Sequence, residues 1–296
     1  MERREGMKSS KKNKLKNLLK FTFLLAVTIM LLFPVFYMIT NSFMSKQEAA
    51  NTYNLISSAS EGNTNKMLSF KFIPDMVTAT QYYSVFFKEP KYLLMFWNSI
   101  IITLPIVLGQ IVVATLAAFA FSKLRFPFRD KIFFIYIIVM MMPFQVTLVP
   151  NYIMLKELGL LGKYSAIILP GIFSTFGVFL LRQFMKSIPE EYMEAGKIDG
   201  AGYFQLFYKI VLPQCKGAMA SLAILVFIDN WNMVEQPLIF LKDESMYPLS
   251  IFLSRINSEE LGLAFACGVI YMLPTLLIYL YGENYLVEGI QLSGIK

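Results

Sequence analysis

Residues 187–213 read SIPEEYMEAGKIDGAGYFQLFYKIVLP, a charged and glycine-punctuated segment that lies between two apolar runs. Around it, 56% of the 296 residues are hydrophobic and 16% are charged, and the mean hydropathy is +0.54. This composition leaves too little polar surface for a soluble domain of this size. We therefore predict a membrane protein in which the quoted segment is a polar loop between two membrane spans.

Six apolar stretches are long enough to cross about 30 Å of hydrocarbon as helices. The first is longer than the core of a usual signal peptide and no small-residue cleavage site follows it, so we expect a retained helix. The predicted fold is an all-α membrane protein with six transmembrane helices, of which only the fifth contains charged residues, Asp229 and Glu235. The six stretches are 21–40, 98–121, 132–150, 164–181, 218–240 and 262–282.

Lys and Arg are distributed unevenly among the segments that join these spans. If the N-terminus is cytoplasmic, 18 of the 27 basic residues face the cytoplasm, as the positive-inside rule requires. We expect a multi-pass protein of the cell membrane with a basic cytoplasmic N-terminus (1–20), a membrane domain (21–282) and a cytoplasmic tail (283–296). Within the membrane domain, the long external loop covers 41–97 and the largest cytoplasmic loop covers 182–217.

The residue inventory argues against several kinds of chemistry. There is no histidine, which excludes Ser-His-Asp and Cys-His nucleophile systems and His-based zinc or haem sites. Cys215 and Cys267 have no spaced partner for a disulfide or a metal, and no G-x-x-x-x-G-K-[ST] phosphate loop occurs. We predict no catalytic residue, metal or cofactor. The net charge of +7 is assigned to topology and anionic membrane lipid, not to nucleic acid.

Local signals within residues 187–213 predict a short helix, a tight turn and a second helix. Ser187 and Glu190 fit a capping box that starts the first helix. Gly200 permits a turn and Asp199 is expected to cap the second helix, which Pro213 ends. The second helix should bury one apolar face, made of Phe204, Phe207, Tyr208 and Val211. Charged residues of the first helix then remain free to meet a cytoplasmic partner, although a solvated connector is the alternative.

Proline is a second organising feature of the spans. Because proline removes a helical hydrogen bond, one proline per span predicts kinked helices in a bundle that opens and closes. The alternative is the general frequency of proline in membrane helices. The residues concerned are Pro34, Pro105, Pro143, Pro170, Pro237 and Pro274.

EAGKIDGAGYFQLFYKIVLP (194–213) resembles the EAA motif of the permease subunits of ABC importers. Further likeness, which includes FWNSIIIT (96–103) and AAFAFSKLRFPFRDKIF (117–133), is to the carbohydrate-importing branch and covers most of residues 90–296. The resemblance implies a type I ABC importer permease fold. The matching motif residues are Glu194, Ala195, Asp199, Gly200, Ala201, Phe207, Ile210, Leu212 and Pro213, with Gly196 in place of the usual second Ala.

The resemblance also implies a set of partners. The cytoplasmic loop would contain coupling helices that dock on a separate ATPase, with a homologous permease subunit, two ABC ATPase subunits and an extracytoplasmic solute-binding protein in the complete importer. For Asp199, a purely structural capping role is an equal alternative. The docking residues assigned in this way are Glu190, Glu191, Glu194, Ala195, Gly196, Asp199, Gly200 and Ala201.

Polar residues of the fifth apolar stretch predict the substrate pathway. On a continuous helix, Asp229, Asn232, Glu235 and Gln236 fall within an arc of about 120°. Ionisable groups in hydrocarbon are costly and should face a cavity or a polar partner, and Trp231 offers an aromatic platform for a sugar. Alternatively, these side chains hydrogen-bond helices of the partner subunit. Weaker candidates are Gln110, Gln145 and Thr147.

Other functions compete with this hypothesis. An ion-coupled secondary carrier would use Asp229 and Glu235 to bind a proton or sodium ion and would work without an ATPase. A permease of the same superfamily could instead carry a non-sugar solute. An intramembrane hydrolase is disfavoured because the chain has no histidine and no evident pair of nucleophile and base. The favoured hypothesis is a permease subunit that forms half of the pathway for a sugar or oligosaccharide.

Overall fold

A computed structural model describes residues 2–52, 71–256 and 260–294, and the regular structure in these ranges is helical. The predicted all-helical fold is therefore confirmed for the described residues. The chain divides into two compact units. The first contains residues 1–88 and 256–269, and the second contains residues 89–255 and 270–296.

The first unit begins with α1 (Glu2–Asn41), whose apolar stretch is exposed from Leu18 to Phe36 apart from partly buried Val35. The unit also contains α3 (Thr80–Tyr83), the π-helix η1 (Ser84–Lys88) and the start of α15 (Leu261–Gly294). Its small core consists of Met44 and Ala49 with Tyr37, Leu261 and Phe265 packed against them. Because α1 starts at Glu2 and α15 ends at Gly294, helix continues through the predicted boundaries at residues 20 and 282.

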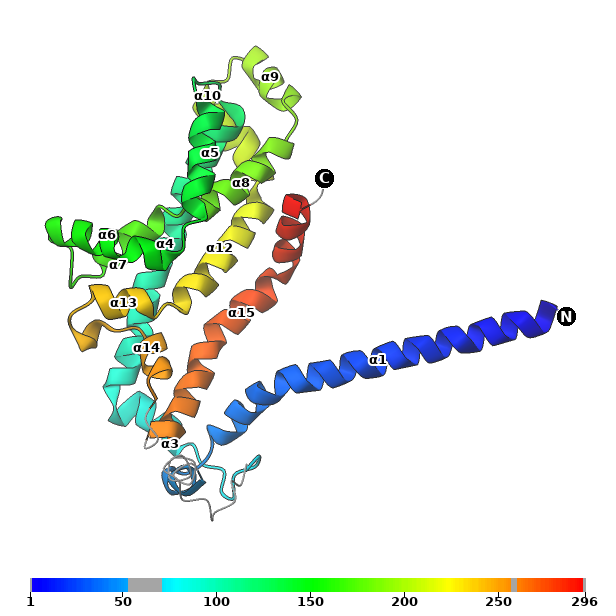
Figure 1. Ribbon diagram of the computed structural model, residues 1–296, viewed down its shortest axis with the longest axis vertical. Helices are drawn as coiled ribbons and strands as arrows, with labels where there is room; N and C mark the ends of the chain where they lie inside the picture. The colour runs from blue at the N-terminus through cyan, green and yellow to red at the C-terminus, as the bar shows by residue number, and fades with distance from the viewer. Residues whose placement is uncertain (1, 53–70, 257–259, 295–296) are drawn as a thin grey trace. The chain divides into compact units, whose positions relative to one another are not determined.

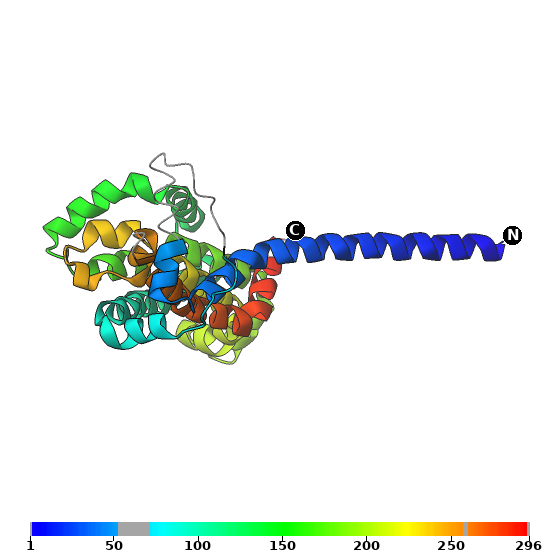
Figure 2. The same cartoon turned by 90° about the horizontal axis from the view of Figure 1, so that it is seen from below.

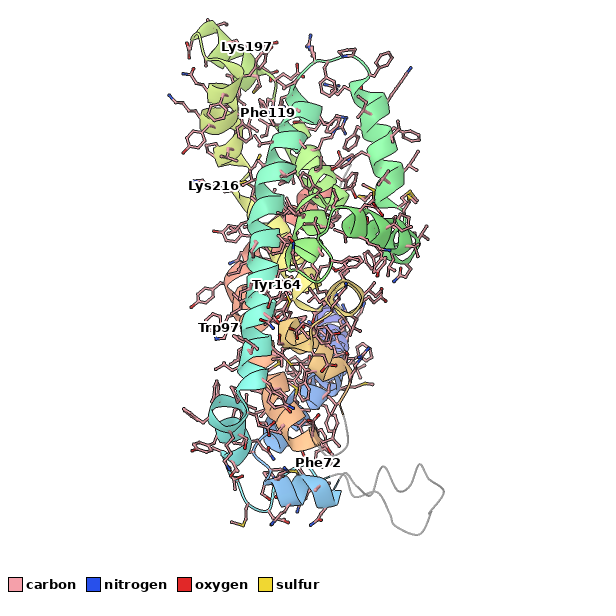
Figure 3. All side chains as sticks on the ribbon, turned by 90° about the vertical axis from the view of Figure 1, so that its left-hand side faces the viewer. Phe72, Trp97, Phe119, Tyr164, Lys197 and Lys216 are labelled. Carbon is pink, nitrogen blue, oxygen red and sulfur yellow. The ribbon has the colours of Figure 1, made fainter. Side chains whose placement is uncertain are left out.

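The second unit is built on α4 (Pro90–Lys123), which packs along α8 (Thr175–Ser187) and α12 (Lys216–Trp231) (Figure 1). Trp97 lies toward one end of α4 and Phe119 toward the other (Figure 3). A Cβ added at Gly177 of α8 would lie 3.1 Å from the Cβ of Ala114 in α4, so glycine permits the close approach of these helices. The buried face of α4 has helical spacing and includes Ile102, Ile106, Gln110, Ala114 and Ala118.

The third predicted span is broken. α5 (Arg129–Met140) and α6 (Phe144–Glu157) meet at 101°, so that α5 is seen end-on in Figure 2 while α6, in green, runs across the view. Pro143 precedes α6 with extended backbone angles (φ −67°, ψ 145°), and the residue before a proline is disfavoured in the α conformation. The expectation of one continuous helix over 132–150 is therefore wrong.

Four described helices are long and apolar enough to cross a membrane, and there are up to six if each bent pair is one span. The four are Lys16–Asn41, Pro90–Lys123, Ser165–Ser187 and Leu261–Tyr285, where the third contains α7 (Ser165–Ile172) and α8. The bent pairs are α5 with α6 and, at 73°, Tyr203–Gln214 with α12. The number of six spans is thus compatible with the described helices.

The fifth predicted span ends earlier than expected. α12 stops at Trp231, and a separate helix, α13 (Glu235–Phe240), follows after three residues. The side-chain amide of Asn232 donates to the carbonyl of Ile228 at 2.7 Å. Pro237 is the third residue of α13, where a backbone N–H has no helical acceptor, so proline is tolerated there. A continuous helix over 218–240 is therefore a wrong prediction, and the arc calculated for its polar residues does not apply.

A short helical connection follows α13 and is attached to α4. It contains the 3₁₀-helix η3 (Glu244–Met246) and α14 (Leu249–Ser254). The amide of the buried Asn98 donates to the carbonyls of Ser245 at 2.7 Å and Tyr247 at 3.1 Å, and its oxygen accepts from the hydroxyl of Tyr164 at 2.8 Å. Asn98 therefore joins α4 to two other segments of the second unit.

Candidate functional site

Residues 188–215 form a loop of short helices at one end of the second unit, where α9 and α10 lie beyond α8 and α12 (Figure 1). We call this segment the helical loop. It contains α9 (Glu191–Ile198), α10 (Tyr203–Gln205), the π-helix η2 (Leu206–Val211) and α11 (Leu212–Gln214). The predicted sequence of helix, turn and helix is confirmed, but both helices start at other residues than predicted.

The caps of the helical loop differ from the sequence expectation. Ser187 is the last residue of α8, and its hydroxyl donates to the carbonyl of Phe184 at 2.7 Å, so it does not start a new helix. Asp199 is the C-terminal cap of α9, and Gly202 occupies the N-cap position of α10. Gly200 has a φ of +80°, which confirms the turn expected there. The predicted role of Asp199 as cap of the second helix is wrong, because three residues of turn separate it from α10.

The second helix of the loop buries a different face from the one predicted. Leu206, Phe207 and Val211 are buried, whereas Phe204 and Tyr208 are 75% and 61% exposed. The π-helical segment changes the spacing of the buried side chains from the α-helical period to about five residues. Pro213 lies within α11, one residue from its end, so the helical run continues slightly past it.

α9 packs closely on η2 through Gly196. A Cβ added at Gly196 would lie 2.5 Å from Cδ2 of Leu206 and 2.8 Å from Cδ1 of Ile210. Met193, one turn before Gly196, is also buried. The absence of a side chain at position 196 therefore lets the two helices of the loop form one compact unit.

The opposite face of α9 is exposed and combines acidic with apolar residues. Glu191, Glu194, Ala195 and Ile198 are spaced to lie on this face, and Ile198 is 86% exposed. Glu191 and Glu194 lie in the first turn, where a negative charge interacts favourably with the helix dipole. This face of α9 therefore presents two carboxylates and one isoleucine to its surroundings.

Basic residues connect the helical loop to the rest of the second unit. The Lys123 ammonium donates to the carbonyl of Ile188 at 2.5 Å. Arg125 lies 3.6 Å from Glu190, but both side chains are largely exposed and such a pair contributes little. Glu190 therefore stays accessible to a partner, as predicted for the docking residues. The connection ties the end of α4 to the residues that lead into α9.

Arg182 holds three elements together near the base of this loop. Its side chain is buried, donates to the carbonyl of Phe121 at 3.2 Å and to Asp130 at 3.4 Å, and lies 3.7 Å from the ring centroid of Phe133. A planar guanidinium can form all these contacts at once, which an ammonium cannot. Neither Lys123 nor Arg182 was among the residues predicted to be functional; one signal for Arg182 is a charge at the end of an apolar run.

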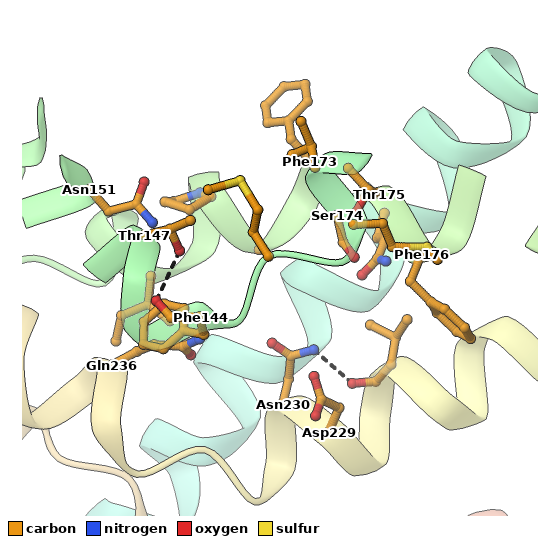
Figure 4. Close-up of a pocket in the computed structure, with 18 of the residues that line it drawn as sticks. Phe144, Thr147, Asn151, Phe173, Ser174, Thr175, Phe176, Asp229, Asn230 and Gln236 are labelled. Atoms are coloured by element: carbon orange, nitrogen blue, oxygen red, sulfur yellow. Dashed lines mark hydrogen bonds between the residues drawn. The ribbon is translucent and has the colours of Figure 1, made fainter. Parts of the chain in front are cut away.

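A cavity of about 880 Å³ lies among seven helices of the second unit, α4 to α8, α12 and α13. Its walls are apolar with several polar groups between them (Figure 4). The polar lining residues are Gln110 of α4, Thr147 and Asn151 of α6, Ser174 and Thr175 at the start of α8, Asp229 and Asn230 of α12, and Gln236 of α13. Sequence patterns alone did not identify Asn151, Ser174, Thr175 and Asn230, because the break at Pro143 and the loop before α8 bring them to the cavity.

The residues predicted for the substrate pathway occupy two kinds of position. Asp229 and Gln236 line the cavity, as do the weaker candidates Gln110 and Thr147. Gln145 and Glu235 are outside the lining and pair with each other, with 3.2 Å between the amide nitrogen and the carboxylate.

Trp231 is 1% exposed and is not presented to the cavity. It stacks between Phe227 and Tyr271, and its indole N–H donates to the carbonyl of Tyr271 at 3.1 Å. The Tyr271 hydroxyl donates to the carbonyl of Trp231 at 2.6 Å and also lies 3.0 Å from the side-chain oxygen of Asn232. Trp231 is therefore a core residue that joins α12 to α15, which corrects the expectation of an aromatic platform for a sugar.

A family model for binding-protein-dependent transport system inner membrane components matches residues 76–285. An arabinooligosaccharide transport permease of Halalkalibacterium halodurans is 28% identical, covering 82% of this chain and 89% of that protein. A lactose transport permease of Rhizobium radiobacter is 31% identical over 71% and 78%, and an sn-glycerol-3-phosphate transport permease of Agrobacterium fabrum is 32% identical over 66% and 71%.

The fold has a counterpart among solved structures. A chain of a bacterial ABC transporter involved in the import of the acidic polysaccharide alginate superimposes with a TM-score of 0.78. The match covers 93% of this chain and 97% of that chain at 21% sequence identity. The all-α permease fold predicted from the sequence is thereby confirmed.

Proposed function

The chain belongs to the family of binding-protein-dependent transport system inner membrane components, and from this premise we propose that it forms half of an ATP-driven pathway for a sugar or oligosaccharide. The single observation that carries the proposal is the family match over residues 76–285, which include the whole helical loop and every lining residue of the cavity. As a member of this family, the chain is a multi-pass inner-membrane protein that works with a solute-binding protein and an ATPase.

In this proposal the helical loop docks on the ATPase. The exposed acidic and apolar face of α9 provides the docking surface, with Glu194 and Ile198 near its centre. Close packing at Gly196 makes α9 and η2 move as one body, and Lys123 transmits their displacement to α4. A rigid helix pair can pass on a displacement that a flexible loop would absorb. The chain itself performs no hydrolysis; its conformational change is driven by ATP hydrolysed on the partner chain.

The chemistry of the cavity supports a sugar as the solute. Its lining offers neutral amide and hydroxyl groups, which can donate to and accept from sugar hydroxyls, between apolar walls. Relatives named for arabinooligosaccharides and lactose support the same class. Asp229 and Gln236 are the pathway residues that we propose, while Trp231, Asn232, Gln145 and Glu235 contribute through packing or hydrogen bonds outside the lining.

The proposed assembly contains this chain, a homologous permease subunit, two ATPase subunits and an external solute-binding protein. Both termini are proposed to be cytoplasmic, since this orientation places 18 of the 27 basic residues on the inside, next to anionic lipid headgroups. In this orientation the helical loop faces the ATPase subunits, and the long external loop (41–97) faces the binding protein.

Purification of the chain from its native membrane, followed by identification of the co-purifying chains, tests the assembly. We expect ATP-dependent sugar uptake in proteoliposomes that vanadate stops. Glu194→Lys should lower uptake by roughly 10- to 100-fold, because a charge reversal at a protein interface costs about 1–3 kcal/mol. Glu157→Lys is the matched control, since Glu157 is an exposed residue at the end of α6, outside the helical loop.

The same preparation distinguishes the ion-coupled carrier. A carrier would accumulate solute when the purified chain alone is reconstituted under a proton or sodium gradient. Uptake of this kind would exclude the proposed coupling to an ATPase, whereas full activity of Glu194→Lys would exclude the docking surface proposed on α9.

A further inference from the structure

Asp229 is the one lining residue with a formal charge among the described residues around the cavity. It lies on the last turns of α12 beside Asn230 and faces the cavity (Figure 4). The other polar lining residues are amides and hydroxyls, and no Lys or Arg lines the cavity in the described part of the chain. The lining therefore contributes a single formal charge, which is negative, to the electrostatic potential of the cavity.

The carboxylate of Asp229 has no partner that would neutralise it. It forms no hydrogen bond or ion pair with any residue that the structure describes, although it is a side chain of an apolar helix. The buried cation of this unit, Arg182, is instead occupied by Asp130 and the Phe121 carbonyl. Asp229 is exposed at the cavity, where water can solvate its carboxylate, so the charge is available to act on a solute that enters.

Neighbouring polar groups reinforce the preference for donors. The amide nitrogen of Asn230 donates to the carbonyl of Val226 at 2.8 Å, and the hydroxyl of Thr147 donates to the carbonyl of Phe144 at 2.9 Å (Figure 4). One N–H of the Asn230 amide and the hydroxyl proton of Thr147 are thus used within their own helices, and the oxygen atoms of both side chains remain as acceptors. With the Asp229 carboxylate, they offer acceptors to a solute that brings hydroxyl or ammonium donors.

We propose that Asp229 makes the pathway selective by charge, so that neutral or amino sugars pass while sugars with a carboxylate or phosphate are rejected. The inference rests on the proposed function and deepens it by naming the class of sugar. It is not given by the family, because relatives are named for sn-glycerol-3-phosphate and a solved transporter for an acidic polysaccharide. The selectivity would belong to this chain through its own carboxylate.

Coulomb's law sets the size of the effect. For a unit charge about 6 Å from the carboxylate, the discrimination between a neutral and an anionic solute is roughly 3-fold in water and about 100-fold at an effective dielectric constant of 20. A hydrated cavity lies between these limits. A cationic reagent should be favoured by a similar factor.

A thiol placed in the cavity can measure this potential without knowledge of the natural sugar. In the complete importer, the buried Cys215 and Cys267 are replaced by Ala, and Asn151→Cys provides one reporter on the wall formed by α6. The reporter is then modified by a trimethylammonium-ethyl or a sulfonatoethyl methanethiosulfonate. The ratio of the two rates is the readout, because changes in thiol pKa or access affect both reagents alike.

We expect the cationic reagent to react faster. Asp229→Asn should lower the rate ratio by about 10- to 10,000-fold, because the two reagents are shifted in opposite directions by about 3- to 100-fold each. Asp229→Glu should retain the ratio, and Asp229→Ser is a second neutral variant if the Asn variant does not assemble. Asp243→Asn is the matched control, because Asp243 is an exposed carboxylate outside the lining. Its side chain accepts a hydrogen bond from the Ser245 N–H, and the side-chain oxygen of an asparagine can accept the same bond. This control should leave the ratio unchanged.

Two results overturn the proposal. In the first, the anionic reagent reacts faster than the cationic reagent in the parent protein. In the second, both neutral variants change the rate ratio by less than about twofold. Faster reaction of the anionic reagent in the parent would mean that the partner permease supplies a cation to Asp229. The outcome is independent of the proposed function, since the thiol ratio can be measured even if no sugar stimulates an ATPase. Conversely, failure of ATP-dependent uptake with an intact ratio would reject the transport proposal alone.

Discussion

Gly196 shows how one residue sets the geometry of the helical loop. Glycine inside a helix costs about 1 kcal/mol relative to alanine, so a free α9 would gain from Gly196→Ala. In the folded loop, however, the added Cβ would lie 2.5 Å from Leu206 Cδ2 and 2.8 Å from Ile210 Cδ1, and overpacking of this kind costs about 1–3 kcal/mol. The second effect is the larger, although the neighbours are the flexible ends of side chains.

We therefore predict that Gly196→Ala destabilises the protein by about 1 kcal/mol and weakens its association with the ATPase. Thermal unfolding in detergent and co-purification with the ATPase are the measurements. Adding Leu206→Ala should restore part of the association if the clash is the cause. An alanine at 196 that stabilises the protein with no effect on association would show that η2 can move away without consequence.

Asn98 is a second residue whose effect exceeds what its position in an apolar helix suggests. Replacing it with Leu leaves the carbonyls of Ser245 and Tyr247 and the hydroxyl of Tyr164 without their partner. A fully buried group without a hydrogen bond costs about 1–3 kcal/mol, and these three groups are partly exposed, so we predict a total loss of about 1–3 kcal/mol and a lower midpoint of thermal unfolding. Tyr164→Phe removes one of the three bonds and should cost less; equal losses would contradict this account.

At the scale of elements, Arg182 determines whether α4, α5 and α8 move together. We predict that Arg182→Gln lowers the number of solute molecules transported per ATP hydrolysed severalfold, because α8 loses its bonds to Phe121 and Asp130. Arg182→Lys should not rescue this ratio, since lysine lacks the planar fork and the stacking on Phe133. Uptake and ATPase activity are measured on the same proteoliposomes.

Two outcomes separate coupling from stability in this experiment. A variant that retains co-purifying ATPase and hydrolysis but transports less supports a role in coupling. If transport and hydrolysis fall in parallel, Arg182 only stabilises the fold and the predicted role is wrong.

At the scale of the whole molecule, the basic residues predict the orientation of the chain in the membrane. Alkaline phosphatase is active only outside the cytoplasm, so we expect inactive fusions after residue 296 and within the helical loop. An active fusion is expected in the connection around Asp243, because one span, α15, separates it from the C-terminus and places it on the opposite side of the membrane. An active fusion at the C-terminus would reverse the orientation and place the helical loop away from the ATPase.

The sequence predicted the long helices better than the broken ones. Most of α4 was evident as the apolar stretch 98–121, because a stretch of that length is typical of a membrane span, whereas residues 90–97 of the same helix were assigned to the external loop. The breaks before Pro143 and after Trp231 were not evident, since apolar residues occur on both sides of each break. Asn232 and the proline two residues into α13 are weak signals that become meaningful only when the backbone is seen.

Composition, charge distribution and the motif at 194–213 were sufficient for the class of protein, the approximate number of spans and the existence of the helical loop, because these depend on the solvent around each segment and on local backbone preferences. Which polar side chains share the cavity depended on packing across segments far apart in the chain. Asp229 and Trp231 are two residues apart, yet one lines the cavity and the other is buried against α15, because successive positions of a helix point in different directions. Only the positions of the surrounding helices decide which side of α12 lines the cavity and which side is buried.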